Sequence, residues 1–332
     1  MRIGVMGMNA KSSELDLRER LTRAAQKLFG LDSAPLRIEN SLLLATCHRT
    51  EIYFSGDDLP AVHGEILELL RKELELPFEE HLYSHFEGDC FLHLAMVVSG
   101  LDSVIIGETE IQRQVKRAYE NALLYRSLST PLHFLFQKCF KIAKEMRSTS
   151  FFPRGNLSLE GSVFQLFKQQ LNLEGPVLFI GNSAINRKIM RFFRRKDVEK
   201  LALCTRGLHA AHEFAHEGSV NLIEWNEISS WQKYPLVICG TNLPEYLLTE
   251  QAMQGEINTR LIIDLCVPRN VDPRLADDPR ITLLNIESMN RLLQAKAGRN
   301  DEQLSRCRES VAHLVTRQLA IFAQKEEKLC CV

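Results

Sequence analysis

The residue of this sequence best suited to covalent chemistry is a cysteine that follows a predicted buried strand. Residues 41–45 form a short apolar run, and Thr46, Cys47, His48 and Arg49 come directly after it. The thiolate is the nucleophilic form of cysteine, and adjacent cationic side chains favour it. The local sequence therefore leaves two interpretations of Cys47, an activated nucleophile or a small and inert buried residue.

A second set of chemically capable residues lies downstream. His93 falls within residues 91–96, which predict a helix in which a histidine is commonly a core residue. Residues 109–112 have the spacing of a capping box, which predicts a helix amino terminus with free N–H groups. The polar residues around that terminus are Ser103, Glu108, Thr109, Glu110 and Gln114.

A nucleotide-binding turn is the third candidate. After the apolar residues 177–180 comes the run Gly181, Asn182, Ser183, Ala184, Ile185 and Asn186, which keeps only the first glycine of the GxGxxG pattern. The next predicted strand, 201–204, leads to Arg206 and not to an acidic residue, so Arg206 is suited to the 2′-phosphate of NADP. The alternative for Arg206 is an ordinary exposed loop arginine.

The elements that must position these residues suggest an α/β multidomain protein. At 332 residues and 45% hydrophobic composition, the chain can bury two cores. A strand near 2–6, a helix near 15–29 and helical patterns over 62–147 predict an α+β domain, and residues 151–156 read as a linker. The apolar runs at 177–180, 201–204, 236–239 and 261–264 alternate with helical patterns, which predicts a parallel, Rossmann-like sheet.

The last part of the sequence predicts a long helix. It begins after Asn285 and extends for about 40 residues, with Gly298 as its weakest point. Its apolar seam consists of Leu304, Cys307, Val311, Leu314 and Phe322. Such a stripe needs another helix, or the body of the protein, to cover it.

Composition narrows the classes of function. The net charge of −1 offers no overall basic field for nucleic acid, so any contact with RNA must be local. A signal peptide and a membrane span are not expected, and nine cysteines without a CxxC pair indicate reduced thiols in the cytoplasm. His209, His212 and His216 have helical spacing but no evident fourth ligand, so we expect surface residues and no metal.

Three segments, 46–53, 93–119 and 264–269, together resemble glutamyl-tRNA reductase. The resemblance implies reduction of the glutamyl group of glutamyl-tRNA to glutamate-1-semialdehyde with NADPH, the first step of five-carbon tetrapyrrole biosynthesis. It also implies a catalytic domain at 1–150, a Rossmann-like NADP-binding domain at 151–284 and, at 285–332, a long helix that is a shortened remnant of a dimerisation region. The implied partners are glutamyl-tRNA, a second copy of the chain and the downstream glutamate-1-semialdehyde aminomutase.

The resemblance also assigns roles to single residues. Cys47 matches the nucleophile that forms a thioester, and His93 matches a nearby histidine that protonates the departing ribose oxygen or orients the substrate. Thr46, His48 and Arg49 match the glutamyl pocket, where a guanidinium fork suits a carboxylate; the alternative for Arg49 is a surface ion pair with Glu51. The other substrate contacts match Ser103, Glu108, Thr109, Glu110 and Gln114. This sequence departs from the family pattern at His48, Thr109 and Glu110, where asparagine, proline and glutamine are common.

Two other functions remain open from sequence. One is a shikimate-type NADP-dependent dehydrogenase acting on a free small molecule, which would not need Cys47. The other is a catalytically silent tRNA-binding homologue, which is compatible with His48 and with the glycine-poor turn.

Overall fold

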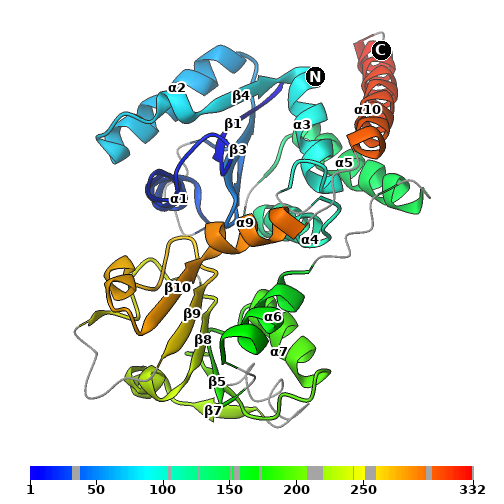
Figure 1. Ribbon diagram of the computed structural model, residues 1–332. Coiled ribbons are helices and arrows are strands. Elements are labelled where there is room, and N and C mark those ends of the chain that lie inside the picture. Colours follow the sequence, from blue (N-terminus) through cyan, green and yellow to red (C-terminus); the bar gives the residue numbers. More distant parts are fainter. Residues whose placement is uncertain are drawn as a thin grey trace. The chain divides into compact units, whose positions relative to one another are not determined.

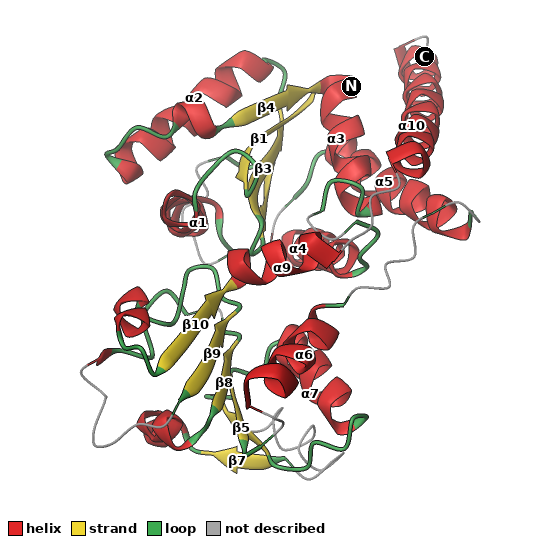
Figure 2. Cartoon of the chain, in the orientation of Figure 1, coloured by secondary structure: helices red, strands yellow, loops and turns green. Residues whose placement is uncertain are grey.

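The computed structural model describes residues 1–31, 38–103, 106–125, 127–149, 152, 158–171, 174–207, 220–241, 243–250, 259–296 and 301–330. The chain divides into two compact units. Unit 1 comprises Met1–Gly155 and Gly298–Val332, and unit 2 comprises Asn156–Ala297. Each unit mixes helices and strands, which confirms the predicted α/β multidomain class (Figures 1 and 2).

Unit 1 is built on a four-stranded antiparallel sheet in the order β2-β3-β1-β4. Its strands are β1 (Ile3–Asn9), β2 (Ser41–Ala45), β3 (Arg49–Ser55) and β4 (Tyr83–Phe86). Asn9 pairs with Arg49, and Gly7 pairs with Tyr83. This register brings the end of β1, the β2–β3 turn and the start of β4 together at one end of the sheet.

Helices cover both faces of this sheet because alternate residues of each strand point to opposite sides. One face packs Met6, Met8, Ile52 and Phe54 into a core with the helices α1 (Leu15–Phe29) and α2 (Leu59–Leu74). The other face packs Val5, Leu44 and Tyr53 into a second core, whose helices are α3 (Glu87–Ser99), α4 (Glu110–Tyr125) and α5 (Thr130–Ser148). A short 3-10 helix, η1 (Glu79–His81), precedes β4.

Sequence reasoning missed β3 and β4. Polar residues begin β3, yet Arg49, Thr50 and Glu51 are all buried. The apolar pattern that marks a buried strand is therefore absent at the place where the polar cluster of this unit forms.

The predicted single helix of about 40 residues is wrong. The structure contains two helices, α9 (Ile286–Lys296) in unit 2 and α10 (Asp301–Cys330) in unit 1. Gly298 lies in the sequence between them, and glycine within a helix costs about 1 kcal/mol relative to alanine. The two helices join different cores, so residues 285–332 do not form one region.

The seam of α10 is covered by its own unit. Cys307, Val311 and Phe322 are buried, and the helix packs against α3 and α5. The ring of Phe322 lies 4.7 Å, centroid to centroid, from the ring of Phe134 on α5. The sequence left open whether another helix or the body of the protein covers this stripe, and the structure shows the body. A homodimer stays a prediction.

Unit 2 contains a six-stranded parallel sheet in the order β10-β9-β8-β5-β6-β7. The strands are β5 (Val177–Ile180), β6 (Leu201–Cys204), β7 (Asn221–Ile223), β8 (Leu236–Cys239), β9 (Arg260–Asp264) and β10 (Ile281–Asn285). The strand order reverses between β5 and β8. This is the Rossmann arrangement that the sequence predicted, and ligands of such sheets bind at the carboxyl ends of the strands where the order reverses.

Helices flank this sheet in unit 2. They are α6 (Leu159–Leu171), α7 (Ala184–Arg194) and α9, with the 3-10 helices η2 (Trp225–Lys233) and η4 (Pro273–Asp277). Trp231 of η2 and Leu275 of η4 are fully buried in a core with Val237 of β8 and Ile262 of β9.

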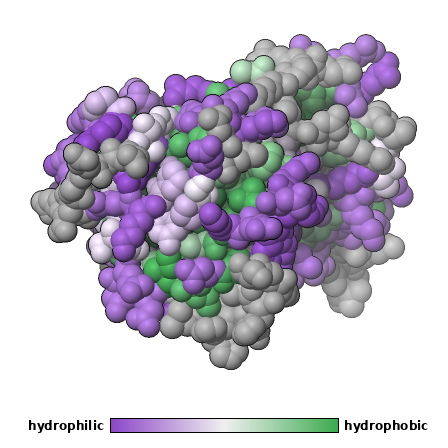
Figure 3. Space-filling model, turned by 60° about the horizontal axis from the view of Figure 1, so that its bottom comes forward, coloured by the Kyte–Doolittle hydropathy of each residue, from purple (hydrophilic) through white to green (hydrophobic). Residues whose placement is uncertain are grey.

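Hydrophilic side chains occupy much of the coloured surface in Figure 3, where hydrophobic residues appear in the middle of the view. Among the described helices, none is both long and apolar enough to cross a membrane. His209, His212 and His216 lie outside the described residues.

Candidate active site

A buried carboxylate, that of Glu51, forms the centre of the polar cluster in unit 1. Its Oε1 atom accepts hydrogen bonds from Arg49 Nη1 at 2.7 Å, from the Tyr83 hydroxyl at 2.6 Å and from His93 Nε2 at 2.8 Å. Its Oε2 atom accepts one from the Tyr53 hydroxyl at 2.7 Å. An ionised carboxylate only accepts hydrogen bonds, so the Nε2 atom of His93 carries a proton.

The strands place these donors around Glu51. Arg49, Glu51 and Tyr53 alternate along β3 and therefore share one face of the sheet. Gly7 on the neighbouring strand leaves room for the carboxylate, because a Cβ atom there would lie 2.7 Å from Glu51 Cγ. Sequence reasoning considered Glu51 only as a partner for Arg49, although the alternation along β3 was a usable signal.

Glu51 and Arg49 stay ionised in this cluster although both are buried. Burial of the Glu51 carboxyl opposes ionisation, but the charge of Arg49, the electrostatic interaction with His93 and the hydrogen bonds outweigh it, so the pKa of Glu51 lies well below its usual range. Burial disfavours the charged form of Arg49 as well, yet the Glu51 carboxylate raises the pKa of that guanidinium. Burial, followed by the charge of Glu51, raises the pKa of Tyr53 and of Tyr83 well above the usual value. Both tyrosines are therefore neutral hydrogen-bond donors.

Arg49 is shared between two carboxylates. Besides Glu51, its Nη2 atom donates to the backbone oxygen of Asp102 at 2.7 Å and to Asp102 Oδ2 at 3.0 Å. Asp102 also forms an ion pair with Lys11. The ion pair of Arg49 with Glu51 that sequence suggested exists, but the prediction that it lies at the surface is wrong, since the two side chains are 3% and 0% exposed.

Cys47 lies in the turn between β2 and β3. Thr46 holds this turn: its Oγ1 atom accepts the N–H groups of His48 and Arg49, both at 3.2 Å, and its own N–H donates to the Arg49 carbonyl at 2.8 Å. Cys47 is partly exposed as a residue, whereas its thiol is surrounded by protein. In the part of the chain that the structure describes, His93 forms its hydrogen bond with Glu51 and none with Cys47.

The prediction that His48 and Arg49 favour the Cys47 thiolate is wrong for this structure. Burial of the thiol, followed by the negative charge of Glu108, raises the pKa of Cys47 to about 12. The positive charge of Arg49 is offset by the carboxylates of Glu51 and Asp102 that it contacts. The thiol is therefore protonated at neutral pH in the absence of substrate.

The remaining predicted substrate contacts lie near the start of α4. Thr109 occupies the position before the helix, and its carbonyl accepts the Arg113 N–H at 3.4 Å. The Glu108 carbonyl accepts Arg147 Nη2 at 2.9 Å, and Glu110 pairs with Arg113 within the helix. Ser103 is buried and Gln114 is half-buried. Of this group, Glu108 and Glu110 act electrostatically on Cys47.

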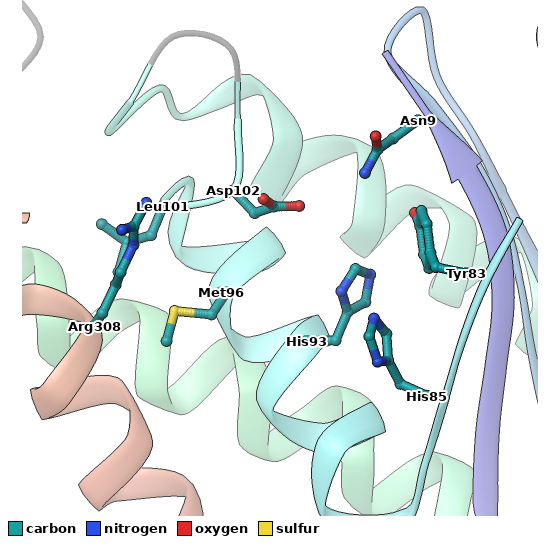
Figure 4. Close-up of a pocket in the computed structure, with 8 residues that line it drawn as sticks. All are labelled: Asn9, Tyr83, His85, His93, Met96, Leu101, Asp102 and Arg308. Atoms are coloured by element: carbon teal, nitrogen blue, oxygen red, sulfur yellow. The ribbon is translucent and has the colours of Figure 1, made fainter. Parts of the chain in front are cut away.

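A cavity of about 400 Å³ opens beside the cluster (Figure 4). The strands contribute Asn9, Tyr83 and His85 to its lining. Helix α3 and the turn after it contribute His93, Met96, Leu101 and Asp102, and α10 contributes Arg308. The rings of His85 and His93 lie 4.9 Å apart between centroids, and those of Tyr83 and His93 lie 5.2 Å apart. The cavity thus has an aromatic wall and contains His93 but not Cys47.

The predicted nucleotide turn of unit 2 follows β5, next to the point where the strand order reverses. Gly181 has a φ of +92°, and a Cβ atom there would lie 2.4 Å from the Gly240 carbonyl oxygen. Asn186, at the place of the third glycine of the pattern, is fully buried and donates to the carbonyls of Ile180 at 3.0 Å and Gly181 at 2.8 Å. Asn186 therefore braces the turn from inside, which differs from the cofactor contact predicted for it.

The rest of this turn fits a nucleotide. Ser183 Oγ accepts the Asn186 N–H at 3.3 Å and caps α7, which leaves the N–H groups of Ala184 and Ile185 at a helix amino terminus suited to phosphate. Among the described residues, the buried Oδ1 atom of Asn182 has no hydrogen-bond partner. It is an acceptor that a hydroxyl group of a bound nucleotide could satisfy.

Arg206 lies just beyond β6, as predicted, and is exposed. Its guanidinium carbon lies 5.7 Å from the centroid of the Trp225 ring. The segment after β9 has a structural role: buried Asp264 accepts the N–H groups of Cys266 at 3.0 Å, Asn270 at 2.8 Å and Val271 at 2.9 Å. Burial raises the pKa of Asp264 to about 6 despite these hydrogen bonds.

In the comparison with known proteins, the two units match different family models. Residues 6–150 match the family model described as "Glutamyl-tRNAGlu reductase, N-terminal domain", and residues 165–292 match the model "Shikimate / quinate 5-dehydrogenase". Glutamyl-tRNA reductase from Chlamydia trachomatis serovar A is 32% identical over 80% of this chain and 77% of its own length. The protein of that name from Akkermansia muciniphila is 28% identical over 96% of this chain and 97% of its own.

Among solved structures, Glutamyl-tRNA Reductase from Methanopyrus kandleri aligns with 99% of this chain and 81% of its own, at 22% identity and a TM-score of 0.48. The family is assigned from the chlamydial protein, because its 32% identity extends over 80% of this chain. The chain belongs to the glutamyl-tRNA reductase family.

Proposed function

We propose that this chain reduces the glutamyl group of glutamyl-tRNA to glutamate-1-semialdehyde with NADPH, through a thioester on Cys47. The observation that carries the proposal is the partly exposed Cys47 at an end of the sheet that also holds the charged cluster of Arg49, Glu51 and His93. The family membership and the Rossmann arrangement of unit 2 support the same reaction.

The first step is acyl transfer. The Cys47 sulfur attacks the carbonyl carbon of the glutamyl ester, the bond from that carbon to the ribose oxygen breaks, and a thioester forms. The thiol loses one proton and the ribose oxygen gains one, so no other reactant is consumed. His93 is the proposed proton donor to the ribose oxygen through Nδ1, the ring nitrogen that is not bound to Glu51.

The substrate itself supplies the charge that activates Cys47. Because Glu108 and Glu110 raise the pKa of the thiol, a cation placed beside them lowers that pKa again. The α-ammonium group of the glutamyl residue is such a cation. Burial is the largest cause of the raised pKa, and the ammonium group would offset the contribution of the two carboxylates to it.

The side-chain carboxylate of the substrate is proposed to bind Arg49. The Nη2 atom that contacts Asp102 is the part of the guanidinium that can exchange partners, because the Nη1 atom contacts fully buried Glu51. Thr46, His48, Ser103, Thr109 and Gln114 stay proposed contacts of the same substrate.

The cofactor is proposed to bind unit 2. Asn182, Ser183 and the N–H groups of Ala184 and Ile185 would hold its phosphates and ribose, and Arg206 would hold the 2′-phosphate that distinguishes NADPH from NADH. When bound, this cofactor would supply the hydride that replaces the sulfur on the thioester carbon, so that the C–S bond breaks, the aldehyde forms and the Cys47 sulfur is released as a thiolate. The cytosolic setting and an encounter with the aminomutase that uses this aldehyde stay predictions.

Label transfer tests the thioester. Protein incubated with radiolabelled glutamyl-tRNA in the absence of NADPH should become labelled, and Cys47→Ser should abolish both labelling and NADPH oxidation. Cys90→Ala and Cys139→Ala, at fully buried thiols, are the controls and should keep labelling. Reduction of glutamyl-tRNA by Cys47→Ser at the rate of the original protein would show that the mechanism is wrong.

A second assay separates the two other functions. NADPH oxidation with glutamyl-tRNA but not with free glutamate supports the proposal. Oxidation that depends on a free small molecule would identify a dehydrogenase of the shikimate type. Binding of glutamyl-tRNA with neither labelling nor oxidation would identify a silent homologue.

A further inference from the structure

The cavity beside the Glu51 cluster has the lining of a nucleoside site. Tyr83, His85 and His93 form a wall of closely spaced rings, and Met96 adds an apolar surface (Figure 4). Nucleobases stack on tyrosine, histidine and arginine side chains in this way. A volume of about 400 Å³ lies within the range of small-molecule sites.

Arg308 gives this cavity a cation. It projects from α10 and is exposed, and within the described residues no carboxylate pairs with it. The one carboxylate in the lining, that of Asp102, is already neutralised by Arg49 and Lys11. A ligand with a negative group near Arg308 therefore meets net attraction.

The residues that line the cavity indicate which part of a substrate it binds. Acyl transfer needs room on two sides of the scissile ester, one for the glutamyl group at Cys47 and one for the departing alcohol. Cys47 does not line the cavity, but His93, the proposed proton donor to that alcohol, does. The space beyond His93 is thus available to whatever is attached to the ribose oxygen.

We infer that this cavity binds the 3′-terminal adenosine of the tRNA, with its base against the rings of Tyr83 and His85 and its 5′-phosphate at Arg308. The inference rests on the proposed function, because the adenosine is the leaving group of that reaction. Residues far from the nucleophile in sequence, on β4 and on α10, thereby become part of substrate recognition.

The nicotinamide nucleotide of the cofactor has related chemistry, a flat base with a ribose phosphate, and is the competing source of such a ligand. Binding of small mononucleotides distinguishes the two without any catalytic turnover. We propose to follow the imidazole signals of His85 and His93 by NMR while adding adenosine 5′-monophosphate, nicotinamide mononucleotide or ribose 5-phosphate.

Adenosine 5′-monophosphate should shift both imidazole signals, and ribose 5-phosphate, which has no base to stack, should bind about 5- to 150-fold more weakly. Arg308→Ala should weaken binding of the nucleotide at least fivefold and should raise, by a similar factor, the concentration of glutamyl-tRNA needed for half-maximal labelling of Cys47. Met96→Trp should fill the cavity and have the same effect.

The matched control is Arg306→Ala on the same helix, since Arg306 forms an exposed ion pair with Glu302 and does not line the cavity. This variant should bind adenosine 5′-monophosphate and glutamyl-tRNA as the original protein does. The inference is wrong if adenosine 5′-monophosphate leaves both imidazole signals unmoved, if only nicotinamide mononucleotide moves them, or if Arg308→Ala and Met96→Trp bind normally. Because the nucleotide arm needs no reaction, it remains decisive even if Cys47 forms no thioester.

Discussion

Replacing Glu51 by glutamine should destabilise unit 1 strongly. The substitution removes a fully buried charge on which four hydrogen bonds converge and leaves Arg49, which is 3% exposed, without its buried partner. Breaking a buried ion pair from one side costs about 3–5 kcal/mol. The free energy of unfolding of unit 1 should therefore fall by about this amount at pH 7.

The loss should also depend on pH in a defined direction. The pKa of Glu51 in the folded protein lies below its ordinary value of 4.5, so below that pH the unfolded chain binds a proton that the folded chain does not. The original protein then loses about 1.4 kcal/mol of stability per pH unit through this group, and the glutamine variant does not. The difference between the two should be constant above about pH 5.5 and should narrow below about pH 4.5.

Amide hydrogen exchange of β3 is the suitable assay. Both tryptophans of the chain, Trp225 and Trp231, belong to unit 2, so their fluorescence reports on the other unit and serves as an internal control. The matched variant is Glu79→Gln, which breaks an ion pair with Arg71 in which both side chains are about half exposed and which solvent screens, so the stability should change little. Equal losses for the two variants, or a difference that does not change between pH 7 and pH 4, would refute the assignment of a buried charge.

Three further predictions concern other elements. Since Glu108 raises the pKa of Cys47, Glu108→Gln should lower that pKa and speed alkylation of the thiol at pH 8 by about tenfold, and an unchanged rate would contradict the proximity of the two groups. Arg206→Ala should weaken NADPH binding by about one to two decades in Kd and leave NADH nearly unchanged, whereas equal losses would show a structural role. Val311→Asp places a charge in the core under α10, so it should lower the stability of unit 1 by more than about 3 kcal/mol and leave the sedimentation coefficient unchanged. Dissociation of a dimer at unchanged stability would instead place the seam at an interface.

Local patterns in the sequence were enough for several features. The apolar run 41–45 predicted a strand that leads to Cys47, and β2 ends at Ala45. Runs of four apolar residues predicted the parallel strands of unit 2, because strands covered on both faces need no polar alternation. Gly181 was recognised as a turn residue, and its positive φ is the physical reason.

Only the tertiary structure determines which partners and which electrostatic surroundings the polar residues have. Glu51 becomes the centre of a cluster because Tyr83 and His93, more than 30 residues away, reach the same face of β3. The raised pKa of Cys47 comes from burial of the thiol and from Glu108, and not from its neighbours in the sequence. Arg308 reaches a cavity of the first 102 residues because α10 packs against α3. A sequence specifies the period of each element, but burial and charge pairing arise from contacts between elements, and these exist only after the strands have paired and the helices have docked.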